Sequence, residues 1–369
     1  MNLSKYCDEP RKSGNRPPAI PGLDGDLDPK PVRRGKPWLY IGLGLLLLIF
    51  AAIVIWPLIS ARAPHTALIR VPKNATDQML QDTLTKYLGK DYALSVRKAI
   101  PIAGGGARLR HGAWKIEQGM TAVEAARRIC KGAQAGIRIS FVNERTLDQV
   151  ATKIAAKYDI PVDSMMAAFN NDKLLAEVRT DREHVIGYFL ADTYEFYWTA
   201  TPEDIIKKMY EHYNRFWSPQ RLDYAEQLHM LPREVVVLAS IVDEETNQAG
   251  EKGTIGRLYI NRIQKGMKLQ ADPTVKYAIG DFSIRRITGD MLNNPSPYNT
   301  YRHEGLPPGP IRITSGATID AILTSRPHGY LYMCAAEDFS GSHNFAVDYE
   351  SHMANAHRYQ QALDQRGIK

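Results

Sequence analysis

An unbroken apolar segment constrains the fold of this chain more than any other feature. No charged residue occurs between Lys36 and Arg62, and the centre of the segment reads IGLGLLLLIFAAIVIW. About 20 apolar residues suffice to cross a hydrocarbon core ~30 Å thick, so residues 37–61 are predicted to form a single transmembrane helix. Trp38 and Trp56 lie near its ends, where interfacial aromatic residues belong. A core helix of a soluble protein is rarely this long and apolar.

The residues before this segment predict its orientation. Arg33, Arg34 and Lys36 precede it directly, and basic residues next to a membrane helix stay in the cytoplasm. We therefore expect a single-pass protein of the cell (inner) membrane, with a cytoplasmic N-terminus and most of the chain on the periplasmic, extracytoplasmic side. Residues 1–36 lack apolar periodicity and are expected to be a disordered tail. A cleavable signal peptide is the alternative, although the long polar tail favours an uncleaved anchor.

The composition of the chain excludes some classes of function. Charged residues make up 24% and apolar residues 44% of the 369 positions, which is typical of a chain that folds around apolar cores. The net charge of +7 is too diffuse to indicate a nucleic-acid partner. No CxxC or Cys/His cluster occurs, so no metal site is predicted and no cofactor is expected. Cys130 and Cys334 are expected to be unpaired thiols, with a disulfide as the alternative.

Beyond the apolar segment, strand and helix patterns alternate, which predicts an α+β fold. Residues 65–135 are predicted to form a small domain. Its elements are a strand over 67–72, a helix over 76–88, a strand over 114–116, and a helix that starts at a capping box of Thr121 and Glu124 and ends at Gly132. Residues 136–365 are predicted to form a second, mixed α+β domain.

The second domain has a strand over 137–142 and then mostly helices over 146–231. The segment GYFLADTYEFYW (187–198) interrupts them, and its aromatic residues suit sugar stacking and core packing equally. A helix over 251–264 precedes a proline-rich, loop-rich region up to Gly309, and long loops in a compact domain are usually functional. A strand over 330–335 and a final helix over 349–363 complete the prediction.

The stretch LPREVVVLASIVDEET (231–246) carries the strongest candidate for chemistry. Pro232 suits the first turn of a helix, although the β-branched residues would also suit a strand. On a helix, the apolar stripe through Leu238, Ile241 and Val242 continues to Glu245. An apolar environment raises the pKa of a carboxyl group and so prepares it to act as a general acid. The alternative is that the helix ends in a solvated acidic turn.

Four segments carry a specific resemblance. They are ASIVDEET, NRIQKGMKLQADPTVKYA, SPYNTYRHEGLPPGPI and SHNFA, and in this order they closely resemble the endolytic murein transglycosylases of the YceG-like (MltG) family. The resemblance covers roughly residues 135–365, and more loosely residues 112–132, which look like the LysM-like unit of that family. The fold class that it implies is α+β: a transmembrane helix, a small LysM-like domain and a mixed catalytic domain.

The resemblance implies an activity and its residues. Members cleave the β-1,4 bond between N-acetylmuramic acid and N-acetylglucosamine in nascent glycan strands and leave 1,6-anhydro ends, which terminates or trims elongation. Glu245 matches the second acid of the family motif, which is catalytic. We expect substrate-binding roles, as direct contacts or as supports, for nine residues: Asp243, Glu251, Asn261, Gln270, Asp272, Thr274, Tyr298, Asn299 and Thr300. The implied partners are peptidoglycan strands and a peptidoglycan synthase or division protein.

The sequence departs from the family pattern at several positions. The lysine that usually separates the two acids of the first motif is replaced by Glu244, whose charge either raises the pKa of Glu245 further or is solvated. GYFLADTY lacks the usual proline, and the usual acid–glycine pair is replaced by the segment 143–146. We expect the departure at 143–146, which lies away from the acid in sequence, to leave the chemistry intact and to affect at most the shape of the groove.

Three other functions fit parts of the sequence. A muramidase would use water and leave reducing ends. A membrane-anchored scaffold that only binds wall polymer would not need an acid in an apolar stripe. A metal hydrolase would have to use His352 and His357, whose spacing does not place them on one helix face.

Overall fold

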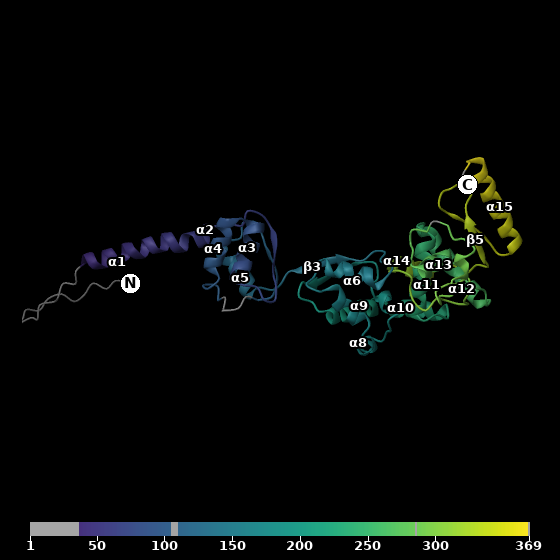
Figure 1. Ribbon diagram of the computed structural model, residues 1–369, viewed down its shortest axis with the longest axis horizontal. Helices are drawn as coiled ribbons and strands as arrows, with labels where there is room; N and C mark the ends of the chain where they lie inside the picture. The colour runs from purple at the N-terminus through teal and green to yellow at the C-terminus, as the bar shows by residue number, and fades with distance from the viewer. Residues whose placement is uncertain (1–36, 105–109, 285, 368–369) are drawn as a thin grey trace, which may run out of the picture. The chain divides into compact units, whose positions relative to one another are not determined.

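Figure 1 shows the computed structural model of the chain, which describes residues 37–104, 110–284 and 286–367. The tail predicted for residues 1–36 lies outside them. The chain divides into two units, Met1–Trp56 and Pro57–Lys369. Helices and short two-stranded antiparallel sheets make up the described residues, so the predicted α+β class is confirmed.

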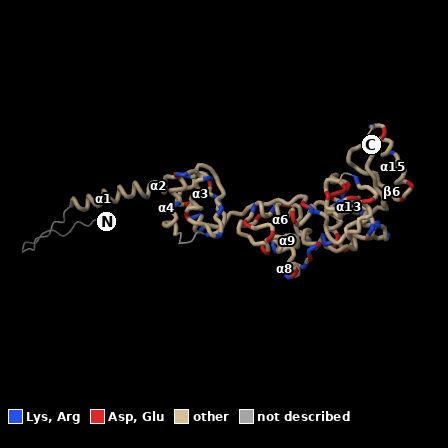
Figure 2. The backbone as a smooth tube through the Cα atoms, in the orientation of Figure 1, with Lys and Arg blue, Asp and Glu red and all other residues tan. Residues whose placement is uncertain are grey.

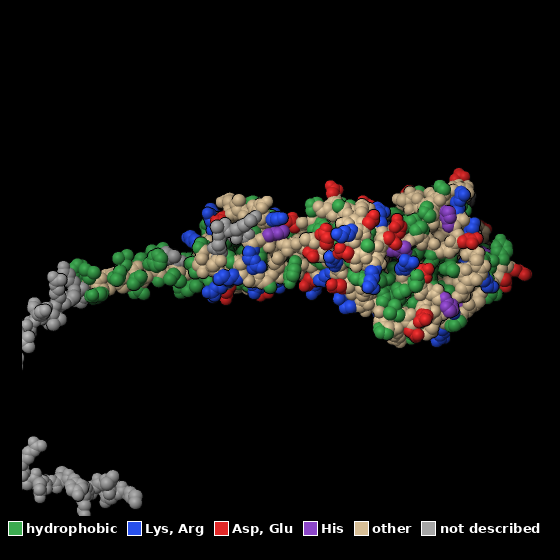
Figure 3. All heavy atoms as spheres, turned by 90° about the horizontal axis from the view of Figure 1, so that it is seen from below, with side chains coloured by type: hydrophobic (Ala, Val, Ile, Leu, Met, Phe, Trp, Pro, Cys, Tyr) green, Lys and Arg blue, Asp and Glu red, His purple; other side chains and the backbone are tan. Residues whose placement is uncertain are grey.

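The apolar segment is helical. Its elements are α1 (Pro37–Phe50), the π-helical turn η1 (Ala51–Ile55) and α2 (Trp56–Ser60). Among the described residues, Trp38–Ser60 is the one helical span long and apolar enough to cross a membrane. Figure 2 shows no Lys, Arg, Asp or Glu along α1, and Figure 3 shows apolar side chains over its surface. Exposed apolar side chains in such a run are typical of a lipid-facing helix.

The first part of the second unit is a β-α-α-β arrangement followed by a helix. Strand β1 (Ala67–Val71) pairs antiparallel with β2 (Gly112–Ile116). Between and after these strands come α3 (Asp77–Leu88), α4 (Lys90–Ala99) and α5 (Ala122–Lys131). Trp114 is fully buried at the centre of a core that these elements share. The predicted capping box of Thr121 and Glu124 is confirmed. Helix α4 was not predicted, because its small buried residues Ala93 and Ala99 weaken the apolar pattern.

A second core begins at strand β3 (Gly136–Ser140), which pairs antiparallel with β4 (Thr193–Tyr197). The helices around this sheet are α6 (Leu147–Ala155), α7 (Val162–Phe169), α8 (Asp172–Glu177), η2 (Val185–Tyr188), α9 (Pro202–Phe216) and α10 (Pro219–Gln227). Five of the six aromatic residues of segment 187–198 are buried in this core, and only Tyr197 is exposed. These five side chains therefore serve packing rather than sugar stacking.

The last part of the chain surrounds one helix, α11 (Pro232–Glu245), whose residues Val235–Val242 are all buried. Around it lie η3 (Ala249–Glu251), α12 (Lys252–Gln264), α13 (Asp272–Ile279), η4 (Met291–Asn293) and α14 (Gly316–Leu323). Strands β5 (Tyr332–Ala335) and β6 (His343–Ala346) pair antiparallel, and α15 (Tyr349–Gln365) packs on them. Helix α13 falls in the region that was predicted to be rich in loops, and α14 falls where no element was predicted. In α13, Pro273 starts a helix rather than stiffening a loop.

Two glycines let α12 approach α14 closely. A Cβ atom added at Gly253 would lie 2.6 Å from the backbone oxygen of Ala321, and one added at Gly256 would lie 2.6 Å from the side chain of Ile322. Neither position has room for a side chain. The spacing of the two helices is therefore set by these residues.

We predict that Gly253→Ala lowers the free energy of unfolding by about 1–3 kcal/mol, because the new methyl group meets backbone that cannot rotate away. Gly250→Ala is the matched control, since nothing lies within 4 Å of an added Cβ there. Thermal unfolding of the two full-length variants in detergent measures the difference. Equal melting temperatures would contradict the close approach of the two helices.

Candidate active site

Glu245 is the last residue of α11 and lies in the wall of a cavity of about 240 Å³. The cavity is built by α11, α12, the start of α13, the loop after η4 and the strands β5 and β6. Its lining residues are Glu245, Leu258, Tyr259, Arg262, Leu269, Gln270, Asp272, Tyr301, Met333, Cys334, Ala335 and His343. Segments that are remote from one another in the sequence thus meet around one carboxyl group.

The carboxyl group of Glu245 is held by Tyr259 on α12. The Tyr259 hydroxyl donates a hydrogen bond of 2.7 Å to Oε1 of Glu245. The ring is 2% exposed, so the hydroxyl has no access to bulk water as a competing partner. Burial and the neighbouring Glu245 raise the pKa of Tyr259 well above its ordinary value. Tyr259 is therefore a fixed hydrogen-bond donor that leaves Oε2 of Glu245 for another partner.

The pKa of Glu245 is raised from 4.5 to about 7, mainly by burial and to a smaller extent by the charge of Asp272. The bond from Tyr259, and more weakly His343 and Lys276, act in the opposite direction. A carboxylic acid with a pKa near 7 can give up and recover a proton at neutral pH.

Gln270 and Asp272 form the mouth of the cavity on the side of α13. Gln270 is exposed and has a φ of 52°, a left-handed conformation that is uncommon outside glycine. Its backbone N–H donates to the carbonyl of Thr300, and the N–H of Ala271 donates to the hydroxyl of Thr300. The hydroxyl of Tyr301 donates to Oδ1 of Asp272 at 2.6 Å. The loop after η4 therefore sets the conformation of this rim.

His343, on β6, lines the opposite side and is fixed by Glu251. Nδ1 of His343 lies 3.0 Å from Oε2 of Glu251, and the backbone N–H of His343 donates to Oε1 at 2.8 Å. Glu251 therefore holds the imidazole at the cavity and does not line it itself.

A larger cavity, of about 780 Å³, lies at the other end of α11. It is lined by Leu231, Pro232 and Arg233 and by tyrosines of η2 and α9. It does not include Glu245. The chemistry indicated by the raised pKa is therefore located in the smaller cavity.

Comparison with known protein families shows which family the chain belongs to. A family model described as the YceG-like family matches residues 69–358. The chain belongs to the YceG-like family. The resemblance inferred from the four sequence segments is thereby confirmed.

Individual relatives agree with this membership. An endolytic murein transglycosylase of Bacillus subtilis strain 168 is 26% identical over 247 residues, which are 63% of this chain and 68% of that protein. One of Streptococcus pneumoniae strain D39 is 26% identical over 47% of this chain, which spans only 32% of that protein. The crystal structure of a YceG-like protein from Listeria monocytogenes has a TM-score of 0.53 at 23% identity and covers 79% of this chain and 98% of that one. This last likeness establishes the fold.

The residues predicted to bind substrate in this YceG-like chain fall into two groups. Gln270 and Asp272 line the Glu245 cavity. Glu251 contacts it through His343. The described residues that line the cavity do not include the other six, which are Asp243, Asn261, Thr274, Tyr298, Asn299 and Thr300.

The polar groups of most of these six are occupied by backbone. Nδ2 of Asn261 donates to the carbonyls of His328 and Tyr330, and Nδ2 of Asn299 donates to those of Leu292 and Asn294. Two others are buried beside Asn299: the hydroxyl of Thr274 donates to the carbonyl of Ala271 and lies 2.8 Å from that of Thr300. The Tyr298 ring packs against that of Tyr277 at a tilt of 44°, with the ring centroids 4.7 Å apart. These contacts support the structure around the cavity, which is one of the two roles predicted for these residues, and contact with substrate stays a prediction.

Asp243 also faces away from the cavity. Its carboxylate receives bonds from Lys252 at 2.6 Å and from the hydroxyls of Thr314 and Thr318 at 2.5 Å. Burial raises the pKa of Asp243, but these bonds outweigh it and hold the pKa below its ordinary value. Asp243 therefore stays ionised and cannot act as a proton donor at neutral pH.

Nine of the lining residues were absent from the predicted set, and four of these have nitrogen or oxygen atoms in their side chains: Tyr259, Arg262, Tyr301 and His343. Tyr259 and Arg262 lie on one face of α12, three residues apart, and this spacing could have identified them as a pair. Nε of Arg262 donates to the carbonyl of Leu331 at 2.6 Å, and its Nη1 donates to that of Leu269 at 2.8 Å. Arg262 therefore joins two walls of the cavity to α12. Cys130 and Cys334 are both free, as expected.

The raised pKa of Glu245 makes stability depend on pH. The folded state holds this proton more tightly than the unfolded state, so stability falls as pH rises from 4.5 to about 7. One pH unit corresponds to ~1.4 kcal/mol, so the ionised carboxylate costs the folded state about 3 kcal/mol above pH 7. We predict that Glu245→Gln equals the parent chain in stability below pH 4.5 and exceeds it above pH 7.

Denaturant unfolding of both full-length chains at several pH values measures this difference. Glu234→Gln is the control, because Glu234 lies in the first turn of the same helix and caps its N-terminus. Parallel stability curves for Glu245→Gln and the parent would show that Glu245 is not protonated in the folded state.

Proposed function

We propose that this chain is a membrane-anchored endolytic murein transglycosylase. It is a peptidoglycan lyase that cleaves β-1,4 bonds between N-acetylmuramic acid and N-acetylglucosamine in nascent strands. One observation carries the proposal: a glutamic acid with a pKa near 7, bonded by a buried tyrosine, faces a cavity of about 240 Å³. Family membership and the names of the two bacterial relatives support the substrate class.

In the first step, protonated Glu245 acts as a general acid. Its proton goes to the glycosidic oxygen while the bond from that oxygen to the anomeric carbon of muramic acid breaks, and the leaving sugar departs as an alcohol. The hydrogen bond from Tyr259 stabilises the carboxylate that this leaves. A donated hydrogen bond to the charged form lowers the cost of ionisation at the moment of transfer.

In the second step, the carboxylate of Glu245 acts as the base. It takes a proton from the C6 hydroxyl of the same muramic acid, whose oxygen attacks the anomeric carbon and closes a 1,6-anhydro ring. Glu245 ends protonated and no water is consumed. Because nucleophile and electrophile belong to one sugar, holding the strand in register makes the attack unimolecular. Gln270 and Asp272 at the cavity mouth, with His343, are the proposed contacts that hold it.

A muramidase remains the second candidate because Asp272 shares the cavity. Glycosidases that use water require two carboxylates, and Asp272 would supply the second. The hydroxyl of Tyr301 occupies one oxygen of Asp272, which favours a binding role over activation of water.

The anchor and the small domain complete the proposal. We place the N-terminus in the cytoplasm and residues 62–369 on the extracytoplasmic side, because Arg33, Arg34 and Lys36 precede the helix. The β-α-α-β arrangement and separate core of the small domain support a LysM-like, glycan-binding unit over 65–135, with the catalytic domain over 136–365. Action on nascent strands implies proximity to a peptidoglycan synthase or division protein.

We predict that Glu245→Gln lowers the release of anhydro-ended glycan from nascent strands by at least about 10³-fold, since the amide cannot donate or accept the proton. Glu234→Gln, on the same helix, should keep nearly full activity. Full-length protein in detergent is incubated with nascent glycan, and mass spectrometry of the products identifies the ends.

The ends of the products separate the candidates. Anhydro ends from the parent chain support the transglycosylase, and reducing ends that require Asp272 would replace it with a muramidase. Equal release by the parent and by Glu245→Gln would reject Glu245 as the acid, and no release by the parent chain would favour a scaffold that only binds wall polymer.

A further inference from the structure

The C-terminal turn of α11 carries three consecutive acids, Asp243, Glu244 and Glu245. A helix C-terminus has a partial negative charge, so acids there are unfavourable unless cations compensate them. Asp243 is compensated by Lys252 and Glu245 is kept protonated. Glu244 has a third arrangement, which the proposed mechanism does not use.

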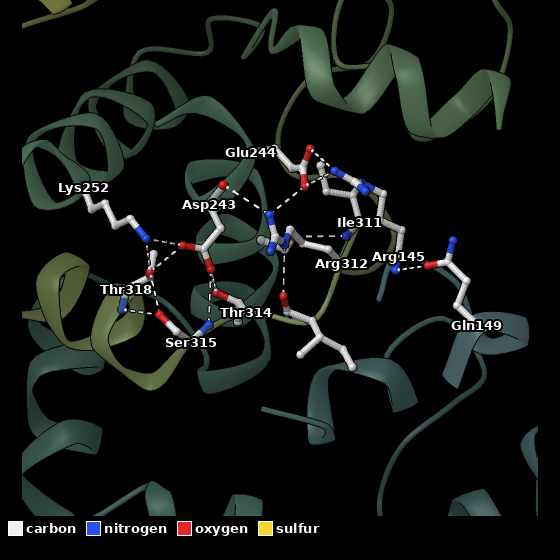
Figure 4. A network of polar contacts seen from close by, with 12 residues as sticks. Arg145, Gln149, Asp243, Glu244, Lys252, Ile311, Arg312, Thr314, Ser315 and Thr318 are labelled. Carbon is white, nitrogen blue, oxygen red and sulfur yellow. Dashed lines mark hydrogen bonds and ion pairs between the residues drawn. The ribbon is translucent and has the colours of Figure 1, made fainter. Parts of the chain in front are cut away.

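Glu244 lies between two arginines (Figure 4). Nη2 of Arg145 donates to both of its carboxylate oxygens, at 2.8 and 2.9 Å, and Nη1 of Arg312 donates to Oε1 at 2.7 Å. The exposed fractions of the three side chains are 27%, 16% and 16% for Arg145, Arg312 and Glu244. Water therefore screens this cluster only in part, and of the two alternatives given for Glu244, the solvated one does not fit its burial between two arginines.

The two arginines come from segments that are remote in sequence. Arg145 precedes α6, and its guanidinium group lies 4.9 Å from the centre of the Phe282 ring. Arg312 belongs to the segment before α14, where the N–H of Ile311 donates to the hydroxyl of Ser240 on α11. Nη1 of Arg312 also donates to the backbone carbonyl of Asp243, which would otherwise lack a helical partner. Both segments are thus attached to the last turn of α11.

We propose that Arg145 and Arg312 clamp Glu244, which fixes the last turn of α11 and balances the charge beside the proton on Glu245. Both arginines are then positioning residues that act through Glu244. Glu244 is adjacent to Glu245 in the chain, so any movement or unbalanced charge there reaches the acid directly. With both arginines present, the cluster carries a net charge of one positive unit.

The other charged or titratable groups that face Glu245 come from every neighbouring element. They are Tyr259 and Arg262 on α12, Asp272 and Lys276 on α13, Tyr301 in the loop after η4, Cys334 on β5 and His343 on β6. Among the described residues, the hydrogen bonds of Glu244 come from Arg145 and Arg312 and not from these groups, so substitutions in the clamp leave them in place. The direction in which each substitution moves the protonation midpoint of Glu245 then follows from the charge that remains on the clamp.

The test measures protonation of Glu245 without relying on turnover. A carbodiimide reacts with the protonated form of a carboxyl group, so peptide mass spectrometry of modified Glu245 over a pH series gives the midpoint of protonation. The full-length chain in detergent is compared with Arg312→Met, Arg145→Met, Glu244→Gln and the double variant Arg312→Met with Glu244→Gln. Arg221→Met is the control, because Arg221 makes a two-bond pair with Asp320, at 2.6 and 2.8 Å, and neither residue lines the Glu245 cavity.

Each arginine variant removes one positive charge, and we expect the midpoint of Glu245 to rise by about half to one pH unit. Glu244→Gln removes the negative charge and should lower the midpoint by a similar amount. The double variant retains one positive charge, as in the parent chain, and should return the midpoint to the parent value. Arg221→Met should not move it. A purely structural role predicts instead that the double variant is at least as perturbed as either single variant.

Activity provides the second measurement, which rests on the proposed function. In Arg312→Met, kcat should fall about tenfold with KM little changed, and the alkaline limb of the rate–pH profile should move up with the labelling midpoint. Unchanged midpoints in the arginine variants, or failure of the double variant to recover, would overturn the clamp. If the parent chain releases no anhydro ends, the proposed function fails, and the labelling midpoints still decide the clamp.

Discussion

The hydrogen bond between Tyr259 and Glu245, made where water is largely excluded, is the interaction on which the site depends. Burial alone would favour a permanently neutral acid, which could not lose its proton readily. The tyrosine hydroxyl stabilises the charged form and brings the pKa to about 7. These two opposing effects give one group the capacity to donate and to recover a proton. The remaining architecture holds Tyr259 and Glu245 together and limits the access of water to them.

The fold achieves this by closing helices and strands around the end of α11. Glycines at 253 and 256 let α12 pack closely on α14, so that Tyr259, farther along α12, reaches Glu245 from a rigid element. Arg262, one turn later, bonds the carbonyls of Leu269 and Leu331 and so joins the rim and strand β5 to the same helix. Buried polar residues such as Asn299 and Thr300 form hydrogen bonds with backbone and so shape the loop that supports the rim.

The sequence predicted what local periodicity encodes and missed what long-range contacts decide. The helix from Pro232, the capping box at Thr121 and the final helix follow from patterns within a few residues. The stripe of α11 also directed attention to Glu245. Spacing on α12 could pair Tyr259 with Arg262 but could not place Tyr259 beside Glu245, because only the crossing of α11 and α12 brings it to the carboxyl group. For the same reason, Asn261 and Thr274 looked like binding residues, although backbone carbonyls occupy their polar groups.

Two acids at the end of one helix show how position decides chemistry. Residues two apart on a helix point about 200° away from each other, so Asp243 and Glu245 face different surroundings. Asp243 faces Lys252 and two threonine hydroxyls, which hold its pKa low, whereas burial at the cavity leaves the pKa of Glu245 high although Tyr259 donates a hydrogen bond to it. Neither difference is a property of the residue type. Divergent pKa values in such a pair assign the proton to Glu245 and leave Asp243 as a fixed charge that binds α14 to α11.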